Sequence, residues 1–218
     1  MPKQVFITGG TGYLGKRLIP LLIQKGYVVK ALSRKGSEHK LPPGCRVVIG
    51  DPFNASSFEG DIEHDSTFIQ LVGVSHPGPS KKDLFYKIDF ASVSASTAAA
   101  TQAGCQHFVY VSVAQIPTSV MHDYQVCRAA CEKMILQSQL KTSILRPWYI
   151  IGPGHYWPLT LLPLFKLLEV IPTTSAKAKA LRLVYLKQML HTLVYAVENP
   201  PADKVSIYEI EDIRRSYP

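Results

Sequence analysis

The stretch TGGTGYLG, residues 8–15, constrains the fold most, because it lies between a short apolar run and a helical pattern. Gly9, Gly12 and Gly15 have the spacing G-x-x-G-x-x-G. The first glycine permits a tight turn, the second lets the backbone approach a pyrophosphate, and the third lets helix and strand pack closely. The N-terminus of the following helix would present free N–H groups and a positive dipole end to phosphates.

This glycine pattern predicts a dinucleotide-binding loop. Its position at the start of the chain, inside a strand–helix–strand unit, favours a cofactor over a glycine-rich turn that serves packing alone. The residues expected to contact the cofactor here are Gly9, Thr11, Gly12, Tyr13, Leu14 and Gly15.

Short β-branched runs alternate with longer helical patterns along the chain. Expected strands cover 4–8, 27–33, 46–50, 66–73, 107–112 and 142–146, with helices over 13–26, 81–104 and 123–139. Further on we expect a helix near 159–169, a strand near 181–186, a helix near 187–198 and a strand over 204–210. Apolar strands that alternate with helices imply a mainly parallel sheet covered on both faces. The predicted fold is therefore α/β, doubly wound and Rossmann-like.

The length of 218 residues, with 46% hydrophobic and 18% charged residues, suits a single globular domain. We expect a cofactor-binding core over about 1–150 and a reduced substrate-covering segment over about 151–218. The helix over 81–104 is rich in Ala and Ser. It could pack against a second copy in a homodimer or against the sheet, and the sequence leaves both open.

The segments after the second and third strands bear on the choice of cofactor. Ser33, Arg34 and Lys35 stand where an acidic residue would bind the ribose hydroxyls of NAD. A hydroxyl and two cations suit a 2′-phosphate, which predicts NADP(H) over NAD(H); the alternative is solvated loop charges. Asp51 could accept from the adenine amino group or cap the turn before Pro52.

The net charge of +8 and the pI of about 9.3 favour anionic partners such as a phosphorylated cofactor. The Lys and Arg residues are scattered, so we expect no nucleic-acid binding. The longest charge-free stretch, Pro147–Phe165, contains four prolines, which argues against a membrane span. No signal peptide is expected, and the cysteines match neither a zinc pattern nor a disulfide framework. A cytoplasmic protein without a metal site follows as the expectation.

Five motifs occur together in a recognisable order: TGGTGYLG, FIQLVG, HFVYVS, YQVCR and LRPWYIIGPG. Together they resemble the short-chain dehydrogenase/reductase superfamily, and more narrowly its atypical branch of epimerase-, dehydratase- and NmrA-like proteins. The resemblance is strongest over residues 3–154. It implies an NAD(P)-binding protein that acts on a small-molecule substrate. It also implies that Leu71, Val72 and Gly73 line the adenine-ribose side and that the loop of Pro147 passes the nicotinamide.

The same resemblance implies a catalytic set. Tyr124 matches the catalytic tyrosine, Ser112 matches the serine that bonds the substrate carbonyl, and Arg128 occupies the position of the usual lysine. A phenol, with a reference pKa of about 10, needs a nearby cation for rapid proton transfer at neutral pH. Arginine keeps the charge but has a larger fork. Alternatively, Arg128 lies flat on a half-buried Tyr124, or Glu132, four residues later, pairs with Arg128 and draws it off the cofactor.

The loops after the fourth and sixth strands carry candidate substrate residues. In a doubly wound sheet such loops lie at the carboxyl ends of the strands, where ligands bind. Packing within the loops is the competing explanation for these side chains. The residues in question are His76, His155, Tyr156 and Trp157.

Together these patterns predict an NADP-dependent oxidoreductase that reduces a small carbonyl or conjugated substrate. One alternative is an NmrA-like redox sensor, which would bind the cofactor and act through a protein partner. Another is an enzyme of the epimerase or dehydratase type acting on a nucleotide sugar. The short C-terminal part argues against this last alternative.

Overall fold

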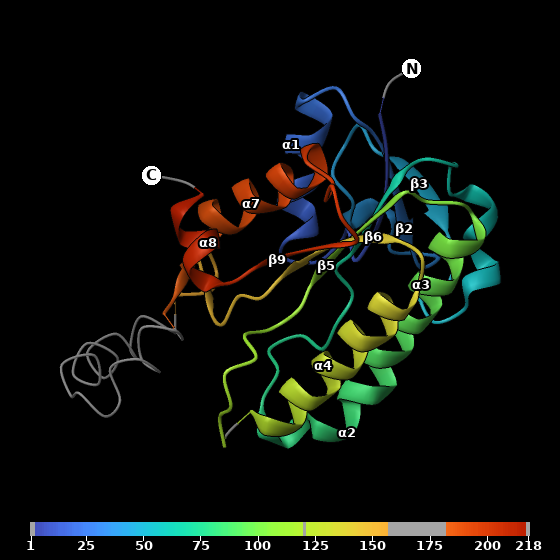
Figure 1. Cartoon of the computed structure of the whole chain (residues 1–218). Helices are drawn as coiled ribbons and strands as arrows, with labels where there is room; N and C mark the ends of the chain where they lie inside the picture. Colours follow the sequence, from blue (N-terminus) through green and yellow to red (C-terminus); the bar gives the residue numbers. More distant parts are fainter. Residues whose placement is uncertain (1–2, 120, 157–181, 217–218) are drawn as a thin grey trace.

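A parallel sheet of seven strands forms the centre of the protein (Figure 1). The structure is a computed structural model, and it describes residues 3–119, 121–156 and 182–216. All neighbouring strands in this sheet pair in parallel. The strand order confirms the predicted Rossmann-like α/β fold. In spatial order the strands are β3 (Arg46–Ile49), β2 (Val28–Ser33), β1 (Gln4–Thr8), β4 (Thr67–Gln70), β5 (His107–Val111), β6 (Lys141–Leu145) and β9 (Val205–Tyr208).

Helices cover both faces of this sheet (Figure 1). On one face, α1 (Gly15–Gln24), α7 (Leu186–Glu198) and α8 (Ile210–Arg215) share a core with alternate strand residues such as Val5 and Ile7. On the other face, α3 (Ala91–Gln102) and α4 (His122–Gln137) pack over Phe6 and its neighbours. Side chains alternate between the faces because successive residues of a strand point in opposite directions.

The core on the α3/α4 face contains a row of stacked phenylalanines. The rings of Phe6 and Phe68 lie 5.3 Å apart, those of Phe68 and Phe108 lie 5.2 Å apart, and Phe58 extends the row to 5.8 Å from Phe6. All four rings are buried. Since these rings come from three adjacent strands and one loop, they fix the lateral order of the sheet centre.

The helix expected over 81–104 forms over residues 82–102, but it contains a π-helical turn that the sequence did not predict. The region begins with the 3₁₀ turn η4 (Pro79–Lys81), continues through α2 (Lys82–Leu84) and the π-helical turn η5 (Phe85–Phe90), and ends with α3. A π turn contains one residue more per hydrogen bond than an α turn. Here it includes Asp89, which is fully buried and paired with Arg128 of α4.

Several expected strands are shorter than their patterns suggested. The strand expected over 66–73 ends at Gln70, whose buried side chain accepts a hydrogen bond from Thr8. The strand expected near 181–186 is reduced to β8 (Val184–Tyr185), which pairs with β7 (Ile150–Ile151) outside the main sheet. The strand expected over 204–210 ends at Tyr208, because Glu209 caps helix α8. The helix expected near 159–169 lies outside the described residues.

Short 3₁₀ turns complete the described elements, namely η1 (Glu38–Lys40), η2 (Ala55–Ser57) and η3 (Glu59–Asp61). Among the described helices, none combines the length and apolar character needed to cross a membrane.

A buried histidine links three central strands. His107, at the start of β5, places Nε2 at 2.9 Å from Ser143 Oγ and Nδ1 at 3.4 Å from Thr67 Oγ1. Burial lowers the pKa of its imidazole from 6.5 to about 4, and the nearby charge of Lys141 acts in the same direction. The folded protein therefore holds this side chain neutral in mildly acidic solution.

We predict that the free energy of unfolding decreases as the pH falls from 6.5 to 4. The unfolded chain takes up a proton on His107 in this range, whereas the folded chain does not, so protonation favours unfolding. The contribution at pH 4 is about 3 kcal/mol. Urea unfolding should show that the free energy of unfolding decreases less between pH 7 and pH 4 for His107→Gln than for the unsubstituted protein. His39→Gln, at an exposed histidine, is the matched control, and equal losses in all three proteins would contradict the prediction.

Candidate functional site

The glycine loop packs against neighbouring backbone so closely that a side chain would not fit at its first and last glycines. Gly9 has a φ of +74°, and a Cβ there would lie 2.7 Å from the carbonyl carbon of Leu71. A Cβ on Gly15 would lie 2.5 Å from the Gly9 oxygen. Helix α1 begins at Gly15 with no side-chain cap. The N–H groups of Lys16 and Arg17 bond the carbonyls of Gly12 and Leu14, so what these first residues of the helix offer an anion is the positive end of the helix dipole.

A cavity of about 420 Å³ opens beside this loop, at the carboxyl ends of the strands. It joins the glycine loop to the segment after β4, the end of β5, helix α4 and the segment after β6. Most of the predicted site residues line it. These are Gly9, Gly12, Tyr13, Leu14, Gly15, Leu71, Gly73, His76, Ser112, Tyr124, Arg128, Pro147 and His155.

Other predicted residues are not among those that line the cavity, and some lining residues were not predicted. Thr11, Ser33, Arg34, Lys35, Asp51, Val72 and Tyr156 do not line the cavity, and Trp157 lies outside the described residues. The lining residues that sequence reasoning missed are mostly apolar, and apolar residues in loops carry no distinctive pattern. They are Val74, Ser75, Pro77, Val111, Val113, Met121, Trp148, Tyr149 and Ile150.

The predicted adenosine-binding residues lie at the ends of β2 and β3. Ser33 is buried and donates to the Arg34 carbonyl, while the side chains of Arg34 and Lys35 are exposed. Asp51 Oδ1 accepts a hydrogen bond from the backbone N–H of Phe53 at 3.0 Å. This is the turn-capping arrangement that the sequence offered as one of two explanations for Asp51.

Arg128 is buried next to Tyr124, but its charge partner differs from the predicted one. Its guanidinium carbon lies 5.0 Å from the centre of the Tyr124 ring, and its Nη2 lies 2.6 Å from Asp89 Oδ1. Nη1 donates to the Tyr110 hydroxyl at 2.9 Å and to the Val111 carbonyl at 3.0 Å. The expected pairing of Arg128 with Glu132 is not formed, so that sequence hypothesis is wrong.

The ionisation of Tyr124 follows from this environment. Burial raises the pKa of its phenol, the charge of Arg128 lowers it, and the charge of Asp89 raises it. The net shift is upward from 10, so the phenol stays protonated at neutral pH. The ring of Tyr124 also packs against Phe85, with ring centres 4.9 Å apart.

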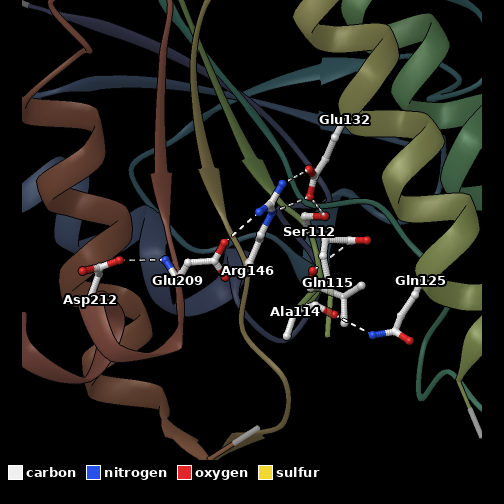
Figure 2. Close-up of polar contacts among 9 residues, drawn as sticks. Ser112, Ala114, Gln115, Gln125, Glu132, Arg146, Glu209 and Asp212 are labelled. Carbon is white, nitrogen blue, oxygen red and sulfur yellow. Dashed lines mark hydrogen bonds and ion pairs between the residues drawn. The ribbon is translucent and has the colours of Figure 1, made fainter. Parts of the chain in front are cut away.

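Ser112 and Glu132 belong to a second polar cluster, shown in Figure 2. Ser112 Oγ donates to Glu132 Oε1 at 2.5 Å. Arg146 holds the same carboxylate by two hydrogen bonds, from Nε at 3.0 Å and from Nη2 at 2.5 Å. A hydroxyl has one proton to donate. Ser112 therefore cannot donate to a substrate carbonyl while it is bonded to Glu132, which departs from the role that the resemblance implied.

A column of stacked side chains lies at the glycine-loop side of the cavity. The rings of Tyr13 and His155 are 4.1 Å apart, and those of His155 and His76 are 4.8 Å apart. Arg17 caps the column at 4.3 Å from the centre of the Tyr13 ring. Gly152 is needed here, because a Cβ would lie 2.5 Å from the Tyr13 hydroxyl. Burial, followed by the charges of His76 and Arg17, lowers the pKa of His155, so its imidazole is neutral at pH 7.

These features fit a dinucleotide better than a metal ion. The glycine loop offers a backbone cradle and an uncapped helix N-terminus, and Arg128 brings a buried Nε without a hydrogen-bond partner to the cavity wall. Within the described residues, no cluster of His, Cys, Asp and Glu is arranged to hold a metal ion.

Comparison with known proteins agrees with this description. Residues 9–155 match the model of a family described as NAD(P)H-binding. A ceramide reductase of Caulobacter vibrioides is 25% identical over 97% of this chain and 65% of its own length. A UDP-glucose 4-epimerase of Vibrio cholerae is 21% identical over 93% of this chain and 69% of its own length.

Solved structures are similar in fold. A short-chain dehydrogenase/reductase superfamily protein from Agrobacterium tumefaciens, crystallised with bound NAD, superposes with a TM-score of 0.67 at 15% identity. The match covers 94% of this chain and 77% of the other. With the family match over the glycine loop and most of the cavity-lining residues, the chain belongs to the NAD(P)H-binding family, and its Rossmann-type fold is similar to that of the Agrobacterium protein.

Proposed function

We propose that this protein is an NADP-dependent oxidoreductase that reduces a small carbonyl or conjugated substrate, with Tyr124 as the proton donor. One observation carries the proposal: Tyr124 lines the same cavity as the glycine loop and lies beside a buried cation, Arg128. The cofactor, when bound, supplies the hydride. The protein supplies the position of the substrate and the proton.

The protonated state of Tyr124 supports the reductive direction. Reduction of a carbonyl leaves negative charge on oxygen, and a neutral phenol at the cavity wall can give up its proton to that oxygen. Because burial raises the pKa of Tyr124, the donor form is the populated form at neutral pH. The alcohol product then carries the phenolic proton, and the phenolate regains one from solvent.

The cavity walls indicate a neutral and largely apolar substrate. Val74, Pro77, Val113, Met121 and Trp148 line the cavity together with Tyr124. Arg128 is the one Lys or Arg among the described lining residues, and Asp89 pairs with it. A diphosphate-linked sugar would require unpaired cations. The described walls therefore support a neutral carbonyl compound over a nucleotide sugar.

The preference for NADP(H) rests on the end of β2. Arg34 and Lys35 are exposed beside buried Ser33, where they would meet the 2′-phosphate of the adenosine ribose. The glycine loop, with Gly12, Tyr13 and Leu14, would hold the pyrophosphate.

We predict that Arg34→Ala weakens NADPH binding by about tenfold, as expected for loss of one charge-assisted contact. NADH binding should change little, because NADH lacks the 2′-phosphate. Fluorescence titration with each cofactor measures both constants, and Arg215→Ala, at an exposed arginine of α8, is the matched control. An equal loss for both cofactors, or no loss for either, would contradict NADP selectivity through Arg34.

A second candidate function is a cofactor-bound redox sensor without turnover. Two contacts specifically favour it: the Ser112 hydroxyl is bonded to Glu132, and Arg128 is paired with Asp89. Such a protein would bind NADPH tightly and pass its redox state to a partner. Consumption of NADPH with an added acceptor distinguishes the two functions.

We predict that Tyr124→Phe lowers the rate of NADPH consumption with an accepted ketone or enone by 10²-fold or more, on the order expected for loss of a general acid. NADPH affinity should stay within about twofold, since the ring and its packing against Phe85 are retained. A screen of apolar ketones, enones and quinones identifies the acceptor. Unchanged turnover in Tyr124→Phe would remove Tyr124 from the reaction, and cofactor binding without turnover on any acceptor would favour the sensor.

A further inference from the structure

The carboxylate of Asp89 is the least expected charge near the candidate site. Asp89 has no exposed surface, and the π-helical turn η5 places it beneath the segment after β4. Its Oδ2 accepts the backbone N–H of Val74 at 3.0 Å, and its Oδ1 lies 2.6 Å from Arg128 Nη2. Burial raises the pKa of this carboxyl, whereas Arg128 and the Val74 N–H lower it, and the two donors facing its oxygens suit the ionised form.

The surrounding structure makes room for this ion pair. A Cβ on Gly73 would lie 2.6 Å from Arg128 Nη2 and 2.9 Å from Asp89 Oδ1. The other guanidinium nitrogen, Nη1, is bonded to the Tyr110 hydroxyl and the Val111 carbonyl. The guanidinium is therefore fixed between η5, the segment after β4 and the end of β5, with its carbon 5.0 Å from the Tyr124 ring centre.

Pairing changes what Arg128 can do for its neighbour. An isolated cation beside a buried phenol stabilises the phenolate strongly, because the interior screens charge poorly. A carboxylate in contact with that cation leaves a pair with no net charge, whose effect on the phenol is much weaker. We propose that Asp89 is a positioning residue that cancels the charge of Arg128 and so makes Tyr124 a proton donor rather than a proton acceptor.

The groups around Tyr124 agree with this assignment. Arg128 and Cys127 face it from α4, Asp89 from η5, and Tyr110, which bonds Arg128, lies on β5. Burial raises the pKa of Tyr124 first, Arg128 lowers it, and Asp89 raises it further.

The proposal rests on the proposed reduction and gives it a direction. In that reaction the two electrons and one hydrogen come from the reduced nicotinamide, the phenolic O–H bond of Tyr124 breaks, and its proton goes to the carbonyl oxygen. The reverse reaction, oxidation of an alcohol, needs the phenolate to accept a proton. A Tyr124 that stays neutral therefore confines alcohol oxidation to high pH.

The test uses Asp89→Asn in the full chain, which removes the charge and keeps an oxygen for the Val74 N–H. Asp123→Asn, at an exposed position of α4 next to Tyr124 in the sequence, is the matched control. The ultraviolet absorbance of tyrosinate is followed against pH in each protein and in the same protein carrying Tyr124→Phe. The difference between each pair isolates Tyr124, and this readout does not depend on turnover.

The Tyr124 step is the rise in tyrosinate absorbance that is lost in Tyr124→Phe. We predict that it occurs at lower pH in Asp89→Asn than in the unsubstituted protein, by about one unit or more. It should not move in Asp123→Asn. A Tyr124 step at the same pH in Asp89→Asn and in the unsubstituted protein would overturn the proposal. If circular dichroism shows that Asp89→Asn is unfolded, the double variant Asp89→Asn with Arg128→Lys carries the same expectation, since it also leaves one unpaired cation next to Tyr124.

Turnover measurements, compared with the tyrosinate titration, distinguish failure of this inference from failure of the proposed function. With an accepted substrate, the pH dependence of alcohol oxidation should move to lower pH together with the tyrosinate step. A shifted tyrosinate step without turnover in any protein would support the role of Asp89 and contradict the proposed reductase. Turnover with an unshifted step would support the reductase and overturn the role of Asp89.

Discussion

The contact between the glycine loop and the backbone around it is the constraint on which the candidate site depends. At Gly9 and Gly15 any side chain would occupy space that the Leu71 backbone and the Gly9 carbonyl already fill. This close approach sets how far β1, β4 and α1 lie from one another. The glycine loop and the segment after β4, which meet in this contact, both line the cavity.

The sequence predicted the parts of the fold that depend on local pattern. The strands predicted over 4–8 and 107–112 match β1 and, to within one residue, β5, and the glycine loop lies where its spacing placed it. It could not predict the π turn at Phe85–Phe90, because the residue that the turn buries, Asp89, is matched to a charge on a different helix. Local propensity carries no information about such a partner.

In the candidate site, too, the sequence predicted which residues share a helix face but not which contacts form between segments far apart in the chain. The four-residue spacing of Tyr124 and Arg128 correctly placed both on one face of α4, and both line the cavity. The same reasoning paired Arg128 with Glu132 and was wrong, because Arg146 of the segment after β6 binds Glu132 through two hydrogen bonds. A bidentate contact outweighs the few tenths of a kcal/mol that a helical pair supplies.

The cluster around Glu132 also connects the candidate site to the end of the described chain. Arg146 Nη1 binds Glu209 at 2.7 Å, and Glu209 caps α8 together with Asp212 (Figure 2). One guanidinium thus binds both the carboxylate that accepts from Ser112 and the carboxylate of Glu209, the N-cap residue of α8. Removing it would leave buried Glu132 without its cation, which is costly in a protein interior. Arg146 therefore contributes both to the arrangement of Ser112 and to the N-terminal end of α8, which Ile210 and Ile213 also anchor in the core.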